Sequence, residues 1–244
     1  MTGLIPPKLG TDPSQGWQYY AVHLASAYVL NEYFLVSNYR MSMVTAERLD
    51  TEVGQWAREM RTQNYHELHS HALVGMWSAF EAGVEDALAA VIEHDRVAGC
   101  AAASRVKTKR NPYPLEFWPW TSATCLGIAQ KLDRCAMQAT TMGGTDLFAR
   151  IQTAFSWVEV SVDLDHTSSK VLAEASRIRN LTLHRHGKVT ESDASDVPSL
   201  KRWIGAVMPI DGAKFTAYYL AIVSCLSAIT NGMSNSRHGN CVTT

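Results

Sequence analysis

The sequence has little net charge and few charged residues of either sign. Its 244 residues carry 22 basic and 23 acidic side chains, a formal net charge of −1, and only 18% of the chain is charged. A disordered chain would have a larger net charge and fewer apolar residues than the 46% found here. A nonspecific nucleic-acid coat would carry a strong positive excess. Both classes are excluded, and a compact globular protein is indicated.

Regular cysteine spacing and long apolar runs are also missing. The five cysteines are odd in number and include no C-x-x-C pair, which argues against a disulfide framework or a zinc ribbon. The most apolar segment, residues 215–229, is shorter than the roughly 20 apolar residues that span a bilayer. Residues 1–13 hold two adjacent prolines and no apolar core of a signal peptide. We therefore expect a cytoplasmic protein without a membrane partner.

Hydrophobic spacing is helical along most of the chain. Apolar residues recur at steps of three and four, which predicts an all-α helical bundle. A brief alternation over 157–164 is too weak to predict a strand. Thr45 is expected to open the second of the predicted helices, and Gly187 to end the sixth. The predicted helices cover 14–40, 44–62, 64–95, 122–141, 145–158, 165–186, 198–207 and 213–231.

The stretch 98–120 interrupts the helical pattern. Three prolines within residues 112–119 forbid a regular helix there. Cations at 105–110 precede the aromatic residues of 113–120, an arrangement seen in platforms that stack single-stranded nucleic acid. The other interpretation, which we favour slightly, is an ordered insertion whose aromatic side chains pack on the core. Residues 1–63 are expected to form a helical extension that packs on a compact domain of residues 64–244.

The near-zero charge conceals an asymmetry. Residues 1–98 hold 6 basic and 12 acidic side chains, a net of −6, and residues 99–244 hold 16 and 11, a net of +5. This division indicates a basic working surface on the second part of the chain.

The densest polar cluster occupies residues 177–187, at the expected end of a helix, and Lys188 follows it. The ordinary structural explanation of such a cluster is that cations at the C-terminal end of a helix complement the helix dipole. So many like charges repel one another unless an anion or an acidic neighbour offsets them. Chemically, histidine can exchange protons with a ribose hydroxyl and a leaving oxygen, and arginine can bind phosphate. The cluster comprises Arg177, Arg179, Asn180, His184, Arg185 and His186.

The spacing inside this cluster limits what one chain can do. Asn180 lies four residues before His184, on the same helical face, where its amide could orient the ring. Arg179 and His184 are five residues apart, about 140° around a regular helix. They converge only if the last turn unwinds before Gly187 or if a second subunit completes the pocket.

Two other groups are weaker candidates. Glu81, Glu85 and Asp86 are expected on a solvated or ion-paired helix face, with a smaller chance that Glu81 or Glu85 contacts the arginines. His66 and His69 share a helical face but His71 is displaced, and no cysteine or carboxylate completes a metal site. No metal and no cofactor are therefore expected.

Two segments resemble the HEPN family, all-α ribonucleases of bacterial toxin–antitoxin and anti-phage systems. Arg179-Asn180, three residues and then His184 match the R-[N/H/D]-x3-H signature of that family. The segment 73–86, with Trp77, Phe80 and Glu81, is similar to a HEPN helix with a Trp/Phe-x-x-x-Glu pattern. The resemblance covers residues 64–231. HEPN toxins in which a partner modifies a tyrosine carry it two residues after the histidine, where this chain has His186.

The resemblance implies a metal-independent endoribonuclease that works as a homodimer, with two motifs meeting in one cleft. Arg179, Asn180 and His184 would then be catalytic, and Arg177, Arg185, His186 and Lys188 would contact the RNA. An antitoxin or a defence-system protein would be a further partner. The alternative is a non-catalytic HEPN-like module that binds RNA, a nucleotide or a protein.

Overall fold

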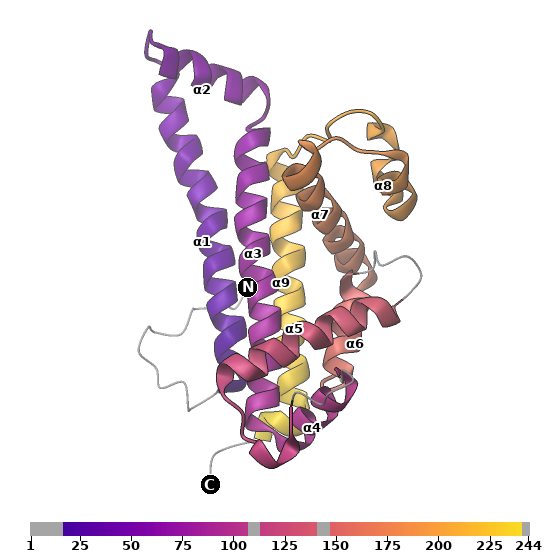
Figure 1. Ribbon diagram of the computed structural model, residues 1–244. Coiled ribbons are helices and arrows are strands. Elements are labelled where there is room, and N and C mark those ends of the chain that lie inside the picture. Colours follow the sequence, from indigo (N-terminus) through magenta and orange to yellow (C-terminus); the bar gives the residue numbers. More distant parts are fainter. Residues whose placement is uncertain (1–16, 107–112, 141–146, 241–244) are drawn as a thin grey trace. The chain divides into compact units, whose positions relative to one another are not determined.

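The computed structural model describes residues 17–106, 113–140 and 147–240, and all their regular elements are helices (Figure 1). Two isolated bridges, Lys188 with Val207 and Val189 with Ile204, are the only β-type pairings among the described residues. The predicted all-α class is thereby confirmed. The α-helices are α1 Trp17–Ala46, α2 Glu52–Thr62, α3 His66–His94, α4 Arg96–Arg105, α5 Ser122–Ala139, α6 Leu147–Ser156, α7 His166–Arg185, α8 Glu191–Asp196 and α9 Gly212–Asn235, with 3-10 turns η1 Leu115–Phe117, η2 Pro198–Trp203 and η3 Arg237–Asn240.

The chain divides into two compact units, each made from separate stretches of sequence. Of the described residues, unit 1 comprises 17–27, 80–106, 113–140, 147–166 and 224–240, and unit 2 comprises 28–79 and 167–223. Helices α1, α3 and α9 each contribute residues to both units. Residues 28–63 thus share a unit with 64–79, and the separate extension of residues 1–63 stays a prediction.

Unit 1 contains α4, α5 and α6. Helix α5 begins because the Thr121 side chain accepts the Thr124 N–H at 3.3 Å, and it buries Cys125, Ile128 and Leu132 completely at steps of three and four. Helix α6 is followed by a turn at 157–159 and an irregular segment up to residue 165, with Val158, Val160 and Val162 fully buried. The alternation over 157–164 therefore reflects burial of every second residue without strand pairing.

Unit 2 contains α2, α7 and α8. Helix α2 joins α1 to α3 (Figure 1), and its Ala57 and Met60 pack with Met43 and Tyr65 in a buried cluster. Helix α7 is tied to α9 by Glu174, which accepts hydrogen bonds from Lys214 Nζ at 2.6 Å and Tyr218 Oη at 2.7 Å. These contacts support the helix that carries the Arg/His cluster.

Several predicted helix boundaries are wrong. Helix α1 continues to Ala46, and Thr51, not Thr45, caps α2 by accepting the Gly54 N–H at 3.3 Å. The interruption predicted from residue 98 is helical up to Arg105, because Asp95 caps α4 through the Ala98 N–H at 2.9 Å. Helix α8 was not predicted, although Thr190 and Asp193 form a complete capping box.

Helix α9 is the one described helix long and apolar enough to cross a membrane by length and composition. Such a helix is weak evidence for a span, since the core helix of a globular protein passes the same test, and 44% of its most apolar window is buried. The four described cysteines, Cys100, Cys125, Cys135 and Cys225, are free thiols. Cys241 lies outside the described residues.

Candidate functional site

The Arg/His cluster occupies the last two turns of α7 in unit 2. The helix is held by Leu172, Ala175, Ile178 and Leu181, which follow one another at steps of three and are all buried. It remains helical to Arg185, so its last turn does not unwind before the histidine. Arg179 and His184 therefore stay about 140° apart around the helix axis within one chain.

A hydrogen bond links Arg179 to the face that carries His184. Arg179 Nη1 donates to Asn180 Oδ1 at 2.9 Å. Asn180 and His184 are both exposed and lie one turn apart. The guanidinium is thus drawn towards the Asn180 face although its own backbone position points elsewhere. Partly buried Arg179 and exposed His184 form a polar strip along the helix end.

The turn after α7 is fixed by two left-handed residues. His186 has φ 51° and Gly187 φ 77°, and the Gly187 N–H donates to the Leu181 carbonyl at 2.9 Å. A Cβ on Gly187 would lie 3.0 Å from Val207 Cγ1, so the backbone passes close to the facing segment. The helix ends before the glycine as predicted, and the turn leaves His186 and Lys188 exposed.

Helix α8 supplies the acidic neighbour that the charge cluster requires. Arg177 forms ion pairs with Asp196 and, at 3.4 Å, with Asp193. Arg185 Nη1 lies 3.6 Å from Asp193 Oδ2. Burial would raise the pKa of Asp193, but hydrogen bonds from Thr190 and the charges of Arg177 and Arg185 outweigh it and lower the pKa. Arg177 and Arg185, two of the predicted RNA contacts, are thus ion-paired within the chain. Their positive charge is partly neutralised by α8.

Two of the histidines of α3, His66 and His69, form hydrogen bonds with the backbone of Ile210. His69 Nδ1 lies 2.7 Å from the Ile210 carbonyl oxygen, and His66 Nδ1 accepts the Ile210 N–H at 2.9 Å. His71 is exposed. No group of three potential ligands that could hold a metal occurs in the described ranges.

The described part of the aromatic stretch packs inward. Tyr113 and Trp120 are each 8% exposed, and Trp118 Nε1 donates to the Ile92 carbonyl at 3.3 Å. Arg105 lies over the Trp157 ring, 4.5 Å from its centroid. Phe117 is the exception, at 67% exposed. These contacts fit an ordered insertion on the core; Lys107, Lys109, Arg110 and Pro112 lie outside the described residues.

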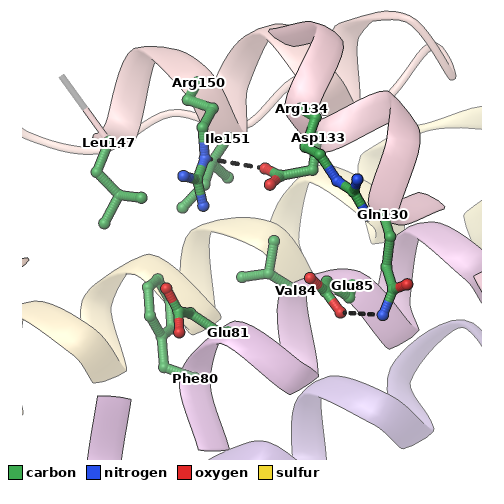
Figure 2. Close-up of a pocket in the computed structure, with 10 residues that line it drawn as sticks. All are labelled: Phe80, Glu81, Val84, Glu85, Gln130, Asp133, Arg134, Leu147, Arg150 and Ile151. Atoms are coloured by element: carbon green, nitrogen blue, oxygen red, sulfur yellow. Dashed lines mark hydrogen bonds and ion pairs between the residues drawn. The ribbon is translucent and has the colours of Figure 1, made fainter. Parts of the chain in front are cut away.

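Unit 1 contains a hollow of about 330 Å³ between α3, α5 and α6 (Figure 2). Asp133 is buried and ion-paired with Arg150 at 2.9 Å, and Gln130 donates to Glu85 at 3.0 Å. Burial raises the pKa of Asp133; Arg150 opposes this shift, whereas the charges of Glu85 and Glu81 add to it. Glu81 and Glu85 thus line a hollow together with Arg134 and Arg150, two residues that no sequence pattern indicates.

The sequence gives no motif for this hollow, because its members come from three helices and are adjacent only after folding. Of the charged residues that line it, Asp133 and Arg150 form an ion pair, and Glu85 accepts a hydrogen bond from Gln130. The sequence motif lies instead on α7, where His184 is exposed, so we take the end of α7 as the candidate site. Comparisons of the chain with protein-family models, with curated proteins and with solved structures find no match. The HEPN resemblance therefore rests on the residues of this chain alone.

Proposed function

We propose that this protein is a metal-independent endoribonuclease of the HEPN type, a toxin or an anti-phage effector. His184 exchanges protons with the ribose 2′-hydroxyl and the departing 5′-oxygen, and Arg179 binds the scissile phosphate and stabilises its developing charge. Asn180 positions the Arg179 guanidinium. His186 and Lys188 are exposed and contact RNA. Arg177 and Arg185 contact it while they stay ion-paired with Asp193 of α8.

The observation that carries this proposal is the hydrogen bond from Arg179 Nη1 to Asn180 Oδ1. It draws the arginine towards the face of His184 without closing the angle of about 140° between the two backbone positions. A second copy of the chain supplies the missing partner when two α7 ends meet, so each cleft takes Arg179 from one copy and His184 from the other. The chemistry needs a dimer.

The test is cleavage of a labelled RNA in EDTA by the wild type and by His184→Ala and Arg179→Ala. Each substitution is expected to reduce cleavage at least about 100-fold, since it removes a general acid/base or a phosphate-binding charge. His71→Ala and Arg48→Ala, which remove exposed side chains of the same types in unit 2, serve as matched controls and should retain full activity. Undiminished cleavage by both α7 variants would overturn the catalytic assignment.

The second candidate is a non-catalytic module that binds RNA, a nucleotide or a protein. It is favoured by the ion pairs of Arg177 and Arg185 with α8, because charges already paired are less available to a reacting phosphate. Binding of RNA by the wild type and by both variants, with no cleavage by any of them, would favour this module.

A further inference from the structure

Unit 2 contains a cavity of its own, which no residue of the Arg/His cluster of α7 lines. Its volume is about 440 Å³, within the range of about 300–1,000 Å³ typical of small-molecule sites. It lies where the end of α1, the turn from α2 to α3 and the start of α9 meet. The residues with polar side chains that line it are Arg40, Arg61, Asn64, Tyr65, His69 and Asp211; Gly212, the first residue of α9, also lines it.

The central observation is a buried histidine nitrogen without a partner. His69 is 1% exposed, and its Nε2 has no hydrogen-bond partner among the described residues. The Ile210 carbonyl can only accept, so His69 Nδ1 carries the proton that it donates at 2.7 Å. Burial lowers the pKa of His69, which favours the neutral ring; the hydrogen bond to Ile210 opposes this shift, and the charge of Arg40 adds to it. Nε2 is therefore a bare acceptor that requires a donor.

Two guanidinium groups and the start of a helix also line the cavity, together with one carboxylate, that of Asp211. Arg40 lies over the Tyr65 ring at 5.0 Å and forms no ion pair with a described carboxylate. A Cβ on Gly212 would lie 3.5 Å from Arg40 Nη1, so this guanidinium sits against the first turn of the 24-residue helix α9. The N-terminus of a helix directs N–H groups and partial positive charge outwards. Arg61, paired with Glu47 at 2.8 Å, adds a second guanidinium.

The ligand must therefore combine an anion with a hydrogen-bond donor. A carboxylate satisfies the guanidinium but has no proton for Nε2. A phosphomonoester, whose second pKa is near 6, combines anionic oxygens with a P–OH in part of its population near neutral pH. We propose that this cavity binds a ligand through a terminal phosphate group, with Arg40 and the start of α9 on the anionic oxygens and His69 Nε2 on the P–OH. The site is independent of the proposed ribonuclease activity.

Asp211 provides an internal check on this assignment. Its Oδ1 caps α9 by accepting the Lys214 N–H at 2.8 Å, and its charge opposes an anion in the cavity. Asparagine caps helices as well as aspartate does. Asp211→Asn should therefore strengthen phosphate binding severalfold while leaving the helix intact.

The test is an NMR titration of the full chain with inorganic phosphate, adenosine 5′-monophosphate and glucose 6-phosphate, followed at the Gly212 amide. Adenosine and glucose are the unphosphorylated controls. Saturable shifts with at least one phosphate probe at millimolar concentration, and none with the controls, are expected. The probe that binds best distinguishes free phosphate, nucleotide and sugar phosphate as the source.

Variants localise the binding. Arg40→Gln should weaken it at least about tenfold, since a charged hydrogen bond is lost, and Arg48→Gln, an equal charge change at an exposed arginine outside the cavity, should not. His69→Asn keeps a donor for Ile210, removes the Nε2 acceptor and should also weaken binding. Circular dichroism checks that each variant is folded. The proposal is overturned if no phosphate probe binds, if adenosine binds as well as its monophosphate, or if folded Arg40→Gln and Asp211→Asn bind like the wild type.

Discussion

Glu174 shows how a buried charge is kept ionised at the level of one residue. Burial would raise its pKa, but hydrogen bonds from Lys214, Ser199 and Tyr218 outweigh that effect and lower it. An unpartnered buried carboxylate would be costly, so this network ties α7 to α9 only while the charge and all three donors are present. The helix that carries the Arg/His cluster depends on it.

Glu174→Gln is expected to lower the free energy of unfolding by about 1–3 kcal/mol near neutral pH, because charged hydrogen bonds are replaced by weaker ones. The folded-state pKa is depressed, so the stabilisation is present above the unfolded pKa of about 4.3 and is lost as the pH falls through the folded value. Urea unfolding at several pH values measures this. The exposed Glu191→Gln is the control; an equal loss at neutral and strongly acidic pH would contradict the charge-based explanation.

His66 stabilises the fold as a neutral side chain, whereas Glu174 does so as a charged one. Its Nδ1 accepts the Ile210 N–H and must stay unprotonated, and burial lowers its pKa, opposed by Glu67. Below the unfolded-state pKa of about 6.5, the unfolded chain binds a proton at His66 that the folded chain excludes. The free energy of unfolding therefore decreases as the pH is lowered. His66→Asn retains an acceptor without titrating, and its unfolding free energy should fall less than that of the wild type between about pH 7 and 5. His71→Asn, at an exposed position, should follow the wild type.

At the level of helices, α9 lies so close to the backbone of Ser161 that a glycine is required at the contact. Two glycine-to-alanine substitutions test this, one at the contact and one in open space. A Cβ on Gly232 of α9 would lie 2.2 Å from the Ser161 carbonyl oxygen, whereas nothing lies within 4 Å of one on Gly127 of α5. Gly232→Ala is expected to destabilise the protein by about 1–3 kcal/mol through overpacking. Gly127→Ala should stabilise it by about 0.5–1 kcal/mol, because a helix interior favours alanine. Thermal melts of the two variants should move in opposite directions; a Gly232→Ala melt like that of the wild type would contradict the packing.

Most helices, but not all their ends, could be predicted from hydrophobic spacing. Apolar residues at steps of three and four predict α3, α5, α7 and α9, since that pattern is local. The break between α1 and α2 was misplaced because Thr45 and Thr51 both qualify as caps, and only packing decides between them. Helix α4 was missed because its alanine-rich turns adjoin a proline-rich stretch, although Asp95 provided a capping residue.

Contacts between residues that are far apart in the sequence could not be predicted from the sequence. The need for an acidic neighbour around the arginines was predictable from charge alone, but its identity was not, because Asp193 and Asp196 follow Arg177 by 16 and 19 residues. The bond between His69 and Ile210 spans 141 residues. A cavity lined by residues that are far apart in the sequence produces no periodic sequence pattern. The cavity lined by Arg40, His69 and Gly212 is therefore visible only in the structure.

At the scale of the whole molecule, the composite cleft makes a prediction that a single-chain site does not. If each cleft takes Arg179 from one copy and His184 from the other, a dimer of Arg179→Ala with His184→Ala has one cleft with both groups and one with neither. Each variant alone has no complete cleft. Activity should therefore reappear when the two inactive variants are mixed.

Random exchange in an equimolar mixture puts half of the dimers in the mixed form, each with one of its two clefts complete, so cleavage should recover to about a quarter of the wild-type rate. The measurement is RNA cleavage in EDTA after the variants have been mixed and allowed to exchange subunits, with mass analysis to confirm mixed dimers. A mixture of His184→Ala with itself under another tag is the control and should stay inactive. Mixed dimers without recovered cleavage would mean that Arg179 and His184 of one chain act together, and the bond from Arg179 to Asn180 would then be the contact that brings them within reach.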